Sequence, residues 1–490
     1  MKQILFLSML LNGLFLSKSN AQYNSNYNKV GRHVGLDFSS GNPIVNMNDN
    51  CTSIETHTST SICNSRNEII FYSNACRVYN RLDQVMPNGS NFNHGTLSDN
   101  YINTDFYPPW KAATIIPFPN DTNKFYMFYE NMEWNVDGLY VPEKLYYLVV
   151  DKSLNGGLGD VTLKDQVVLS GDTLTDGEVL AVKHGNGKDW WIVCRKFKSD
   201  KYYKILVNSS GVQSPLIQHI GISYTFANAI NGVCNENPNG EKMVFVYQSA
   251  STSPYLPTQI DLFHFDRCSG LFSNYTQLLF PNITDTVLLG ICCFSPSGKY
   301  LYSHDGHSIW QFDLTVSNIK NSEIYVGKSD SNALLHMQIG PDNKIYVGPY
   351  GSANYIGVIN HPDSLGAACD FQPYQIYCHG GGNYADGGLP NTPNFALGAV
   401  APCGVGIENI VTTNESLTVC PNPTNSSLKI SSRQIIKSIT VFDLVGKEIF
   451  NEVINKKMET IDLEGHSNGL YFIKIINENG EIITKKIVKE

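Results

Sequence analysis

The chain has 490 residues, of which 16% are charged and 11% aromatic, and it contains 40 glycines. Its length allows two or three domains. Low charge with many aromatic residues is typical of an exported β-protein and excludes a disordered or coiled-coil chain. The formal net charge of −9 argues against nucleic-acid binding, because the phosphate backbone is bound by clustered lysines and arginines.

Residues 1–21 predict a secretory signal peptide. Lys2 supplies the positive end, an apolar run extends from Ile4 to Leu16, and Ser19 to Ala21 form a small, polar cleavage edge. An uncleaved membrane anchor is the alternative, but the run is short for a span and no positive cluster follows it. No later stretch approaches ~18 apolar residues, so we expect a mature protein that is not integral to a membrane.

The chain carries 12 cysteines, and an exported protein is one in which disulfides form. No C-x-x-C pair occurs, so we expect structural disulfides or buried thiols and neither a metal site nor a cofactor. Spacing alone does not give the disulfide connectivity.

After the leader, residues 23–29 are rich in Asn and Tyr and are expected to be loose. Two strands follow, His33 to Phe38 and Ile44 to Met47, separated by a Ser-Gly-Asn-Pro turn. We expect this hairpin to complete the last sheet of a ring that closes without covalent continuity.

A turn followed by an aromatic or β-branched strand then recurs. The clearest copies are Pro296 to Tyr302 and Pro341 to Val347. The first strand residues of the six copies are Ile69, Phe125, Trp190, Met243, Tyr300 and Ile345. Spacings of 45 to 65 residues, with several strands in each unit, predict an all-β fold. Residues 22–402 would form a β-propeller of six or seven blades, with seven favoured because both chain ends supply strands.

Each unit places a polar residue at the end of its third strand. These residues are Asn80, Asp151, Asn208, Asp266, Asp313 and Asn360. Their regular recurrence favours turn capping by the side chain over catalysis. Beyond the repeats, Gly380 to Gly388 is glycine-rich, and we expect a closing strand near Phe395 to Leu397.

Residues 403–416 form a linker, and residues 417–490 form a second domain. About seven short strands in this tail predict a small β-sandwich. Four stretches have a distinctive pattern: Val419 to Pro423, Ile439 to Lys447, Asn468 to Lys474 and Lys485 to Glu490. The residues that carry it most clearly are Pro421, Asn422, Pro423, Gly446, Gly469, Leu470 and Tyr471.

These motifs resemble the type A C-terminal sorting domain of the Bacteroidetes type IX (Por) secretion system. The resemblance implies export across the inner and then the outer membrane, with the secretion machinery as partner. It also implies removal of the tail and either release or attachment to surface lipopolysaccharide. The body resembles the uncharacterised propeller proteins that carry this tail, through Gly35 to Pro43, Ile69 to Asn74 and Pro341 to Val347.

No complete catalytic constellation is found, and the catalytic residues stay unknown. Ser303 to His307 is dense in titratable groups, but Asp305-Gly306 between two strands predicts a hairpin turn. Glu130, Glu133 and Asp137 are conceivable paired carboxylates for glycoside hydrolysis.

Long inserts interrupt the period at residues 93–112 and 131–143. Their aromatic residues, Tyr107, Trp110, Trp134 and Tyr140, either stack on a sugar or protein partner or roof the sheet below. The first functional hypothesis is therefore a non-enzymatic, secreted or cell-surface module that binds a protein or glycan. The alternative is a hydrolase or lyase with its site at the central channel, and a third is a structural adhesin.

Overall fold

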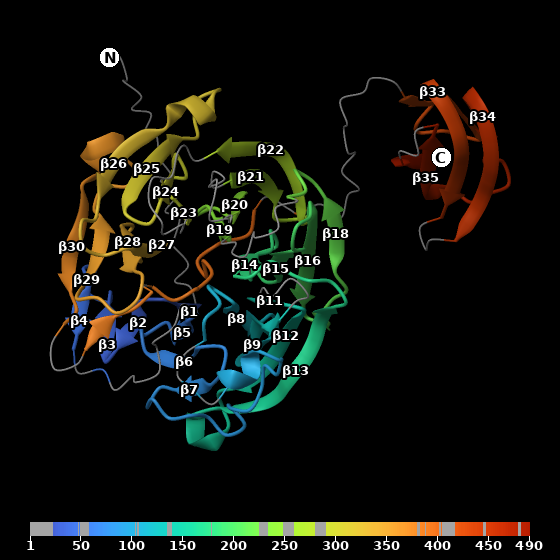
Figure 1. The fold of residues 1–490 in the computed structure, drawn as a ribbon. Helices are drawn as coiled ribbons and strands as arrows, with labels where there is room; N and C mark the ends of the chain where they lie inside the picture. Colours follow the sequence, from blue (N-terminus) through green and yellow to red (C-terminus); the bar gives the residue numbers. More distant parts are fainter. Residues whose placement is uncertain are drawn as a thin grey trace, which may run out of the picture. The chain divides into compact units, whose positions relative to one another are not determined.

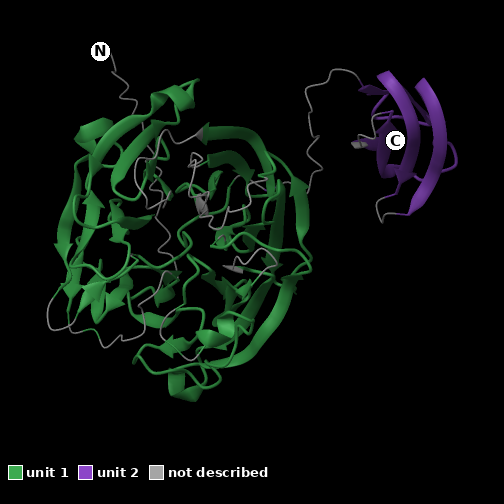
Figure 2. Ribbon diagram, in the orientation of Figure 1, with its two compact units in different colours: residues 1–401 green, residues 402–490 purple. Residues whose placement is uncertain are grey.

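The computed structural model divides into two compact units, residues 1–401 and 402–490 (Figure 2). It describes residues 23–47, 49, 58–102, 104, 107–134, 140–177, 179–224, 234–247, 259–279, 291–379, 383–387, 389–400, 403, 417–443, 447–478 and 482–490. The predicted signal peptide and most of the predicted linker lie outside these residues.

Unit 1 is built from small antiparallel sheets, which confirms the predicted all-β class. The first sheet has the order β1-β5-β6-β7, with strands Tyr23–Asn24, Thr60–Asn64, Ile69–Ser73 and Val78–Asn80. The second has the order β13-β12-β9-β8, with strands Asp160–Ser170, Lys144–Asp151, Asp121–Glu130 and Ala113–Phe118. The third has the order β14-β15-β16-β17, with strands Leu180–Lys183, Trp190–Arg195, Lys201–Asn208 and Gly211–Val212, and β18 (Leu216–His219) also pairs with β16.

The next sheets follow in chain order. They are β19-β20-β21-β22, from Cys234–Glu236, Lys242–Tyr247, Gln259–Asp266 and Leu271–Leu279; β23-β24-β25-β26, from Cys292–Phe294, Tyr300–His304, Ser308–Asp313 and Ile324–Lys328; and β27-β28-β29-β30, from Leu334–Ile339, Ile345–Pro349, Tyr355–Ile359 and Phe371–Tyr377.

Two further sheets complete the unit. One joins both ends of the repeat region as β31-β2-β3-β4, from Tyr384–Ala385, Tyr27–Arg32, Val34–Asp37 and Ile44–Asn46. The other is the hairpin β10 (Glu133–Trp134) with β11 (Tyr140–Val141). The helices of the described residues are short 3-10 turns, Ser98–Asn100, Asn155–Gly157, Ile319–Ser322 and Gly366–Cys369, and none of them is long and apolar enough to cross a membrane.

The recurring turn and strand, called the turn-and-strand repeat below, occupies the same position in six sheets. Its six strands are β6, β9, β15, β20, β24 and β28, and each pairs with the strand directly before it in the chain. The turn of the repeat therefore joins the first two strands of a sheet, except in the sheet β1-β5-β6-β7, where β1 precedes them.

These strands are apolar because both of their faces are buried. In β15, Trp190 and Ile192 pack into one hydrophobic cluster, while Trp191 and Val193 pack into the next. Side chains of a strand point alternately to opposite faces, so each sheet shares one core with the sheet before it and another with the sheet after it.

The strands that directly precede the six repeat strands contact each other in sequence. Contacts run from β5 to β8, β14, β19, β23 and β27. The ring continues from β29 to β31 and returns from β2 to β5, and Figure 1 shows the sheets grouped around a common centre.

Two local predictions near the chain ends were wrong. Residues 23–29 were expected to be loose, but Tyr23 pairs with Asn64 and Tyr27 pairs with Asp37. Buried aromatic contact explains this, because the Tyr23 ring packs edge-on against Phe125 at 5.3 Å.

The closing strand is β31, not the segment near Phe395 to Leu397. That segment belongs to residues 389–400, which cross the centre of unit 1 (Figure 1, orange) without strand pairing. Its asparagines hold it: the Asn391 side chain donates to the backbone oxygens of Lys111, Ala113 and Val179.

Five of the six predicted turn caps are confirmed. Asn80, Asp151, Asn208, Asp266 and Asp313 each accept a hydrogen bond from the backbone N–H two residues later, at 2.8 to 2.9 Å. Asn360 differs, because its amide donates to Asp370 and Gln375. These polar residues are thereby accounted for as architecture.

Unit 2 is one sheet in the order β32-β33-β35-β36, with β34 paired to β33. The strands are Leu417–Cys420, Ser427–Phe442, Glu448–Asp462, Gly469–Asn477 and Ile482–Lys489. The seven short strands expected from the sequence are thus five, since β33 and β34 each run through a predicted break. Register shifts near Ile436 bend β33 without ending it, as β-bulges do.

Candidate functional site

The two inserts bind to each other through the backbone of Met132. Its carbonyl oxygen accepts from the N–H groups of Leu97 and Ser98, both at 3.2 Å. Its own N–H donates to the Ser98 hydroxyl at 2.6 Å. A Cβ on Gly95 would lie 2.7 Å from the same carbonyl oxygen, so this close approach requires glycine.

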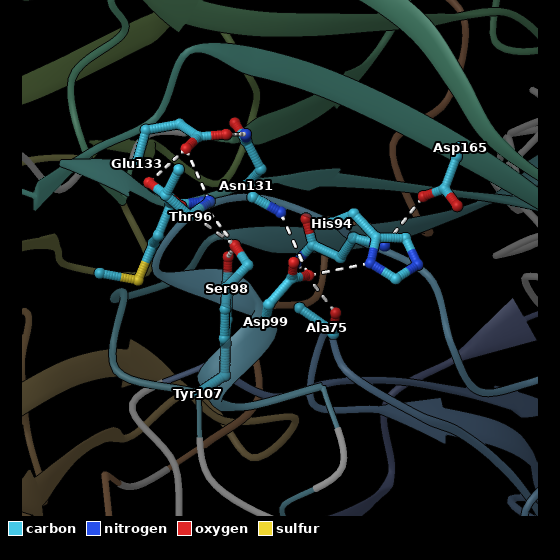
Figure 3. A network of polar contacts seen from close by, with 12 residues as sticks. Ala75, His94, Thr96, Ser98, Asp99, Tyr107, Asn131, Glu133 and Asp165 are labelled. Atoms are coloured by element: carbon cyan, nitrogen blue, oxygen red, sulfur yellow. Dashed lines mark hydrogen bonds and ion pairs between the residues drawn. The ribbon is translucent and has the colours of Figure 1, made fainter. Parts of the chain in front are cut away.

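A polar network fixes the outer part of the inserts (Figure 3). The Glu133 carboxylate accepts from the Thr96 N–H at 2.7 Å and from the Asn131 amide at 2.8 Å. The Asn131 oxygen accepts from the N–H groups of Glu143 and Lys144. The backbone N–H of Trp134 donates to the Thr96 hydroxyl at 3.2 Å, so the residue that carries the indole is tied to this network.

The candidate aromatic residues separate by burial. Tyr107 is fully buried and donates to the Glu130 carbonyl at 2.8 Å, while Trp110 is 7% exposed and packs edge-on against His336. Both side chains are packed inside the fold and are not accessible to a partner at the surface. Trp134 is 54% exposed, and the side chain of Tyr140 lies outside the described residues.

Two of the three suggested carboxylates have structural positions. Glu130 is fully buried within the sheet, Glu133 holds the insert network, and Asp137 lies outside the described residues.

The predicted turn at Asp305 is confirmed, because its carboxylate accepts from the N–H groups of His307 and Ser308. His304 is buried, Nε2 lies 2.7 Å from the Leu335 oxygen, and burial lowers the pKa of His304 to about 4. It is a neutral structural histidine at ordinary pH.

A polar groove of about 880 Å³ lies beside β2 and β6. In it the buried ammonium of Lys29 pairs with Asp49 at 2.7 Å and with Asp83. Because Lys29 lies on β2 and Asp83 follows β7, this triad joins two sheets and is structural. Across the described residues, no group of three or more His, Cys, Asp or Glu side chains is placed to hold a metal ion.

A second cavity, called the axial cavity below, has a volume of about 420 Å³ and lies where the first strands of the sheets meet residues 391–396. Three turns of the turn-and-strand repeat contribute Pro238, Pro296 and Pro341 to the lining of this cavity. Glu236 at the end of β19 supplies the carboxylate among its described lining residues. Burial raises the pKa of Glu236 to about 7, while the charge of Lys111 and the Asn394 N–H act in the opposite direction.

Glu236 was missed in the sequence, although a signal existed. The corresponding last residues of β23 and β27 are Phe294 and Ile339. An acidic residue at this position, directly before a copy of the repeated turn, is therefore an exception to the pattern.

In unit 2 the Pro-Asn-Pro motif lies along β36. The Asn422 amide donates to the Lys486 oxygen at 2.7 Å, and its side-chain oxygen accepts from the Val488 N–H at 2.8 Å. Thr424 continues this pairing as a parallel bridge to Lys489. The side chain of Asn422 thus satisfies backbone groups of β36 as a neighbouring strand would.

The other motif residues complete the same region. Tyr471 is buried, and its hydroxyl donates to the Ser467 oxygen. Gly469 pairs with Lys489 and Leu470 with Val488. Gly446 lies outside the described residues.

Residues 418–490 match the family described as "Secretion system C-terminal sorting domain". The tail is a type IX secretion sorting domain. The chain is thus a cargo of that system, bound for the cell surface or beyond, and the sorting domain implies recognition by the type IX machinery. No curated protein matches the sequence of the chain.

Solved structures resemble the chain at low identity. PorZ, an essential surface component of the type IX system of Porphyromonas gingivalis, is 12% identical with a TM-score of 0.29; the match covers 77% of this chain and 51% of PorZ. A Lactobacillus plantarum protein is 9% identical over 80% of this chain and 95% of its own, with a TM-score of 0.35. A putative TolB from Agrobacterium tumefaciens is 15% identical over 57% and 91%, with a TM-score of 0.29.

Proposed function

We propose that the chain is a non-enzymatic binding protein that the type IX route delivers to the cell surface or the medium. Its binding surface would be the insert surface, defined as residues 93–101 together with 131–134. The observation that carries this proposal is the exposure of Trp134, at 54%, on a backbone held by the Thr96 and Glu133 hydrogen bonds.

Such a residue suits recognition of a glycan or a protein. An indole offers a large apolar face and a donor, and tryptophan is enriched among residues that dominate binding energy. A platform already fixed by hydrogen bonds loses little conformational entropy when a partner docks. The His94 ring adds a second polar contact at the rim, 2.8 Å from the Asp99 carboxylate.

We further propose the domain plan of the exported protein. Residues 1–21 are a signal peptide, residues 22–402 a seven-bladed β-propeller, residues 403–416 a linker and residues 417–490 a β-sandwich. The sheet that β31 shares with β2, β3 and β4 supports seven blades. The pairing of Tyr23 supports a mature chain that begins close to residue 22. The return of residues 422–424 to β36 supports a closed sandwich.

The alternative is a hydrolase or lyase at the central channel. Glycoside hydrolysis uses two carboxyl groups about 5 to 9.5 Å apart. The described lining residues of the axial cavity supply Glu236 and no second carboxylate or histidine, so the geometry favours binding over catalysis.

A glycan array and a surface-protein pull-down test the proposal with the mature full chain and its Trp134→Ala variant. We expect at least one ligand whose affinity falls about 30-fold in the variant, the loss typical of a hot-spot residue. Tyr325→Ala is the matched control, since Tyr325 is 47% exposed on β26, and it should bind normally. Equal losses in both variants, or binding unchanged by Trp134→Ala, would refute the insert surface as the site. Turnover in a hydrolase panel with no binder would refute a non-enzymatic role.

A further inference from the structure

The axial cavity has the size of a small-molecule site. Its volume of about 420 Å³ lies within the ~300–1,000 Å³ of known ligand pockets. Several sheets contribute to its wall, including β8 through Thr114, β14 through Ala181 and β27 through Ile339. A site built on paired strands is rigid, as small-molecule binding requires.

Most amide donors of the lining are already used by the protein. The Asn391 amide donates to three backbone oxygens, and the Asn394 amide donates to Pro238. Further amides that donate to protein acceptors are those of Asn24, Asn26 and Gln338. A ligand in this cavity therefore finds few side-chain donors and must supply donors itself.

Two side-chain acceptors of the lining have no described hydrogen-bond donor from another side chain, the Glu236 carboxylate and the buried Oε1 of Gln338. Burial raises the pKa of Glu236 to about 7 even though the Lys111 charge acts against the shift, so its ionised form is poorly compensated by the protein. Cys293 also lines the cavity, but burial raises the pKa of its thiol to about 12 and keeps it neutral. The remaining wall is apolar at Pro238, Pro341 and Phe395.

We propose that the axial cavity binds a small organic cation, a primary ammonium compound with a short alkyl chain, and that Glu236 is its anionic contact. The ammonium donates to the carboxylate that the protein leaves under-compensated, in a charge-assisted hydrogen bond. The alkyl part covers the proline and Phe395 surfaces. A divalent metal fits less well, because it needs several oxygen ligands and the described lining offers one carboxylate.

Titration calorimetry tests this with the mature full chain and two probes, propylammonium and neutral 1-propanol. We expect propylammonium to bind at pH 8 and 1-propanol not to bind. Affinity should fall about tenfold at pH 6, because a group with a pKa near 7 is mostly protonated there. Lys111 and Cys293 are the titratable groups that act near Glu236, and the thiol stays neutral across this range.

Three variants decide the location. Glu236→Gln removes the charge at constant volume and should abolish the preference for propylammonium over 1-propanol. Ala396→Trp should block the exposed rim of the cavity and reduce binding while Glu236 stays in place. Glu241→Gln, on an exposed residue of the adjacent turn, is the matched control and should bind normally.

Several results would overturn the proposal. These are no binding of propylammonium at pH 8, equal binding of 1-propanol, affinity independent of pH, or full affinity in both Glu236→Gln and Ala396→Trp. Because the insert surface is a separate site, these results are independent of the outcome with Trp134→Ala.

Discussion

Replacing Glu236 by glutamine should stabilise unit 1 at alkaline pH. The pKa of this carboxyl rises from 4.5 to about 7 on folding because burial disfavours its charged form. The folded state therefore holds the proton more tightly than the unfolded chain does. The contribution of Glu236 to the free energy of unfolding is therefore highest below pH 4.5, falls as the pH rises from 4.5 to 7, and stays at the lower level above pH 7.

The size of the effect follows from the shift. One pKa unit corresponds to about 1.4 kcal/mol, so the ionised carboxylate costs about 3 kcal/mol at pH 8 and less than about 1 kcal/mol at pH 5. Glutamine has nearly the same volume and can still accept from the Asn394 N–H. We expect Glu236→Gln to raise the free energy of unfolding by about 3 kcal/mol at pH 8 and to change it little at pH 5.

Urea unfolding followed by tryptophan fluorescence measures this difference. All five tryptophans of the chain, Trp110, Trp134, Trp190, Trp191 and Trp310, lie in unit 1, so the signal reports that unit alone. Glu241→Gln, an exposed change on the same sheet edge, should leave the unfolding free energy unchanged at both pH values. A Glu236→Gln variant no more stable than the wild type at pH 8, or equally stabilised at pH 5, would show that the carboxylate is not desolvated as described.

Two further predictions concern the tail and the polar groove. Asn422→Ala removes two hydrogen bonds to β36 and should destabilise unit 2 by about 1–3 kcal/mol. Calorimetry should show this as a lower melting temperature of the tail. The control is Asn451→Ala, at an exposed residue, and equal melting temperatures of the two variants would contradict the role of Asn422. Lys29→Met leaves the buried Asp49 and the partly buried Asp83 without their cation. It should lower the unfolding free energy of unit 1 by about 3–5 kcal/mol, measured by urea unfolding. Arg66→Met breaks a pair whose side chains are 78% and 56% exposed and should cost under about 1 kcal/mol; a similar cost for both would refute the importance of burial.

Local patterns predicted the frame of this protein well. The turn-and-strand repeat predicted one inner strand in each of six sheets, because Gly, Asn and Pro fix turn geometry within a few residues. The turn caps from Asn80 to Asp313 followed for the same reason. The tail was recognisable because its motifs are contiguous in sequence.

Non-local contacts caused the failures. Residues 23–29 contribute to strands because Tyr23 pairs with Asn64 and packs against Phe125, both of which lie far along the chain. The closing strand was misplaced because Pro393 and Asn394 follow an axial path that other sheets impose. Tyr107 and Trp110 were candidate surface residues, but burial depends on what covers a side chain, which sequence does not show.

The sequence by itself determined the all-β class, the turn positions and the export route, since each depends on short-range chemistry or a contiguous motif. Tertiary structure decided which polar groups lie in an environment that changes their chemistry. Glu236 is an ordinary glutamate in the chain and becomes a desolvated carboxyl only where the first strands and residues 391–396 enclose it. The exposure of Trp134 was likewise decided by the tertiary structure, because the insert network holds its backbone where the side chain is 54% exposed.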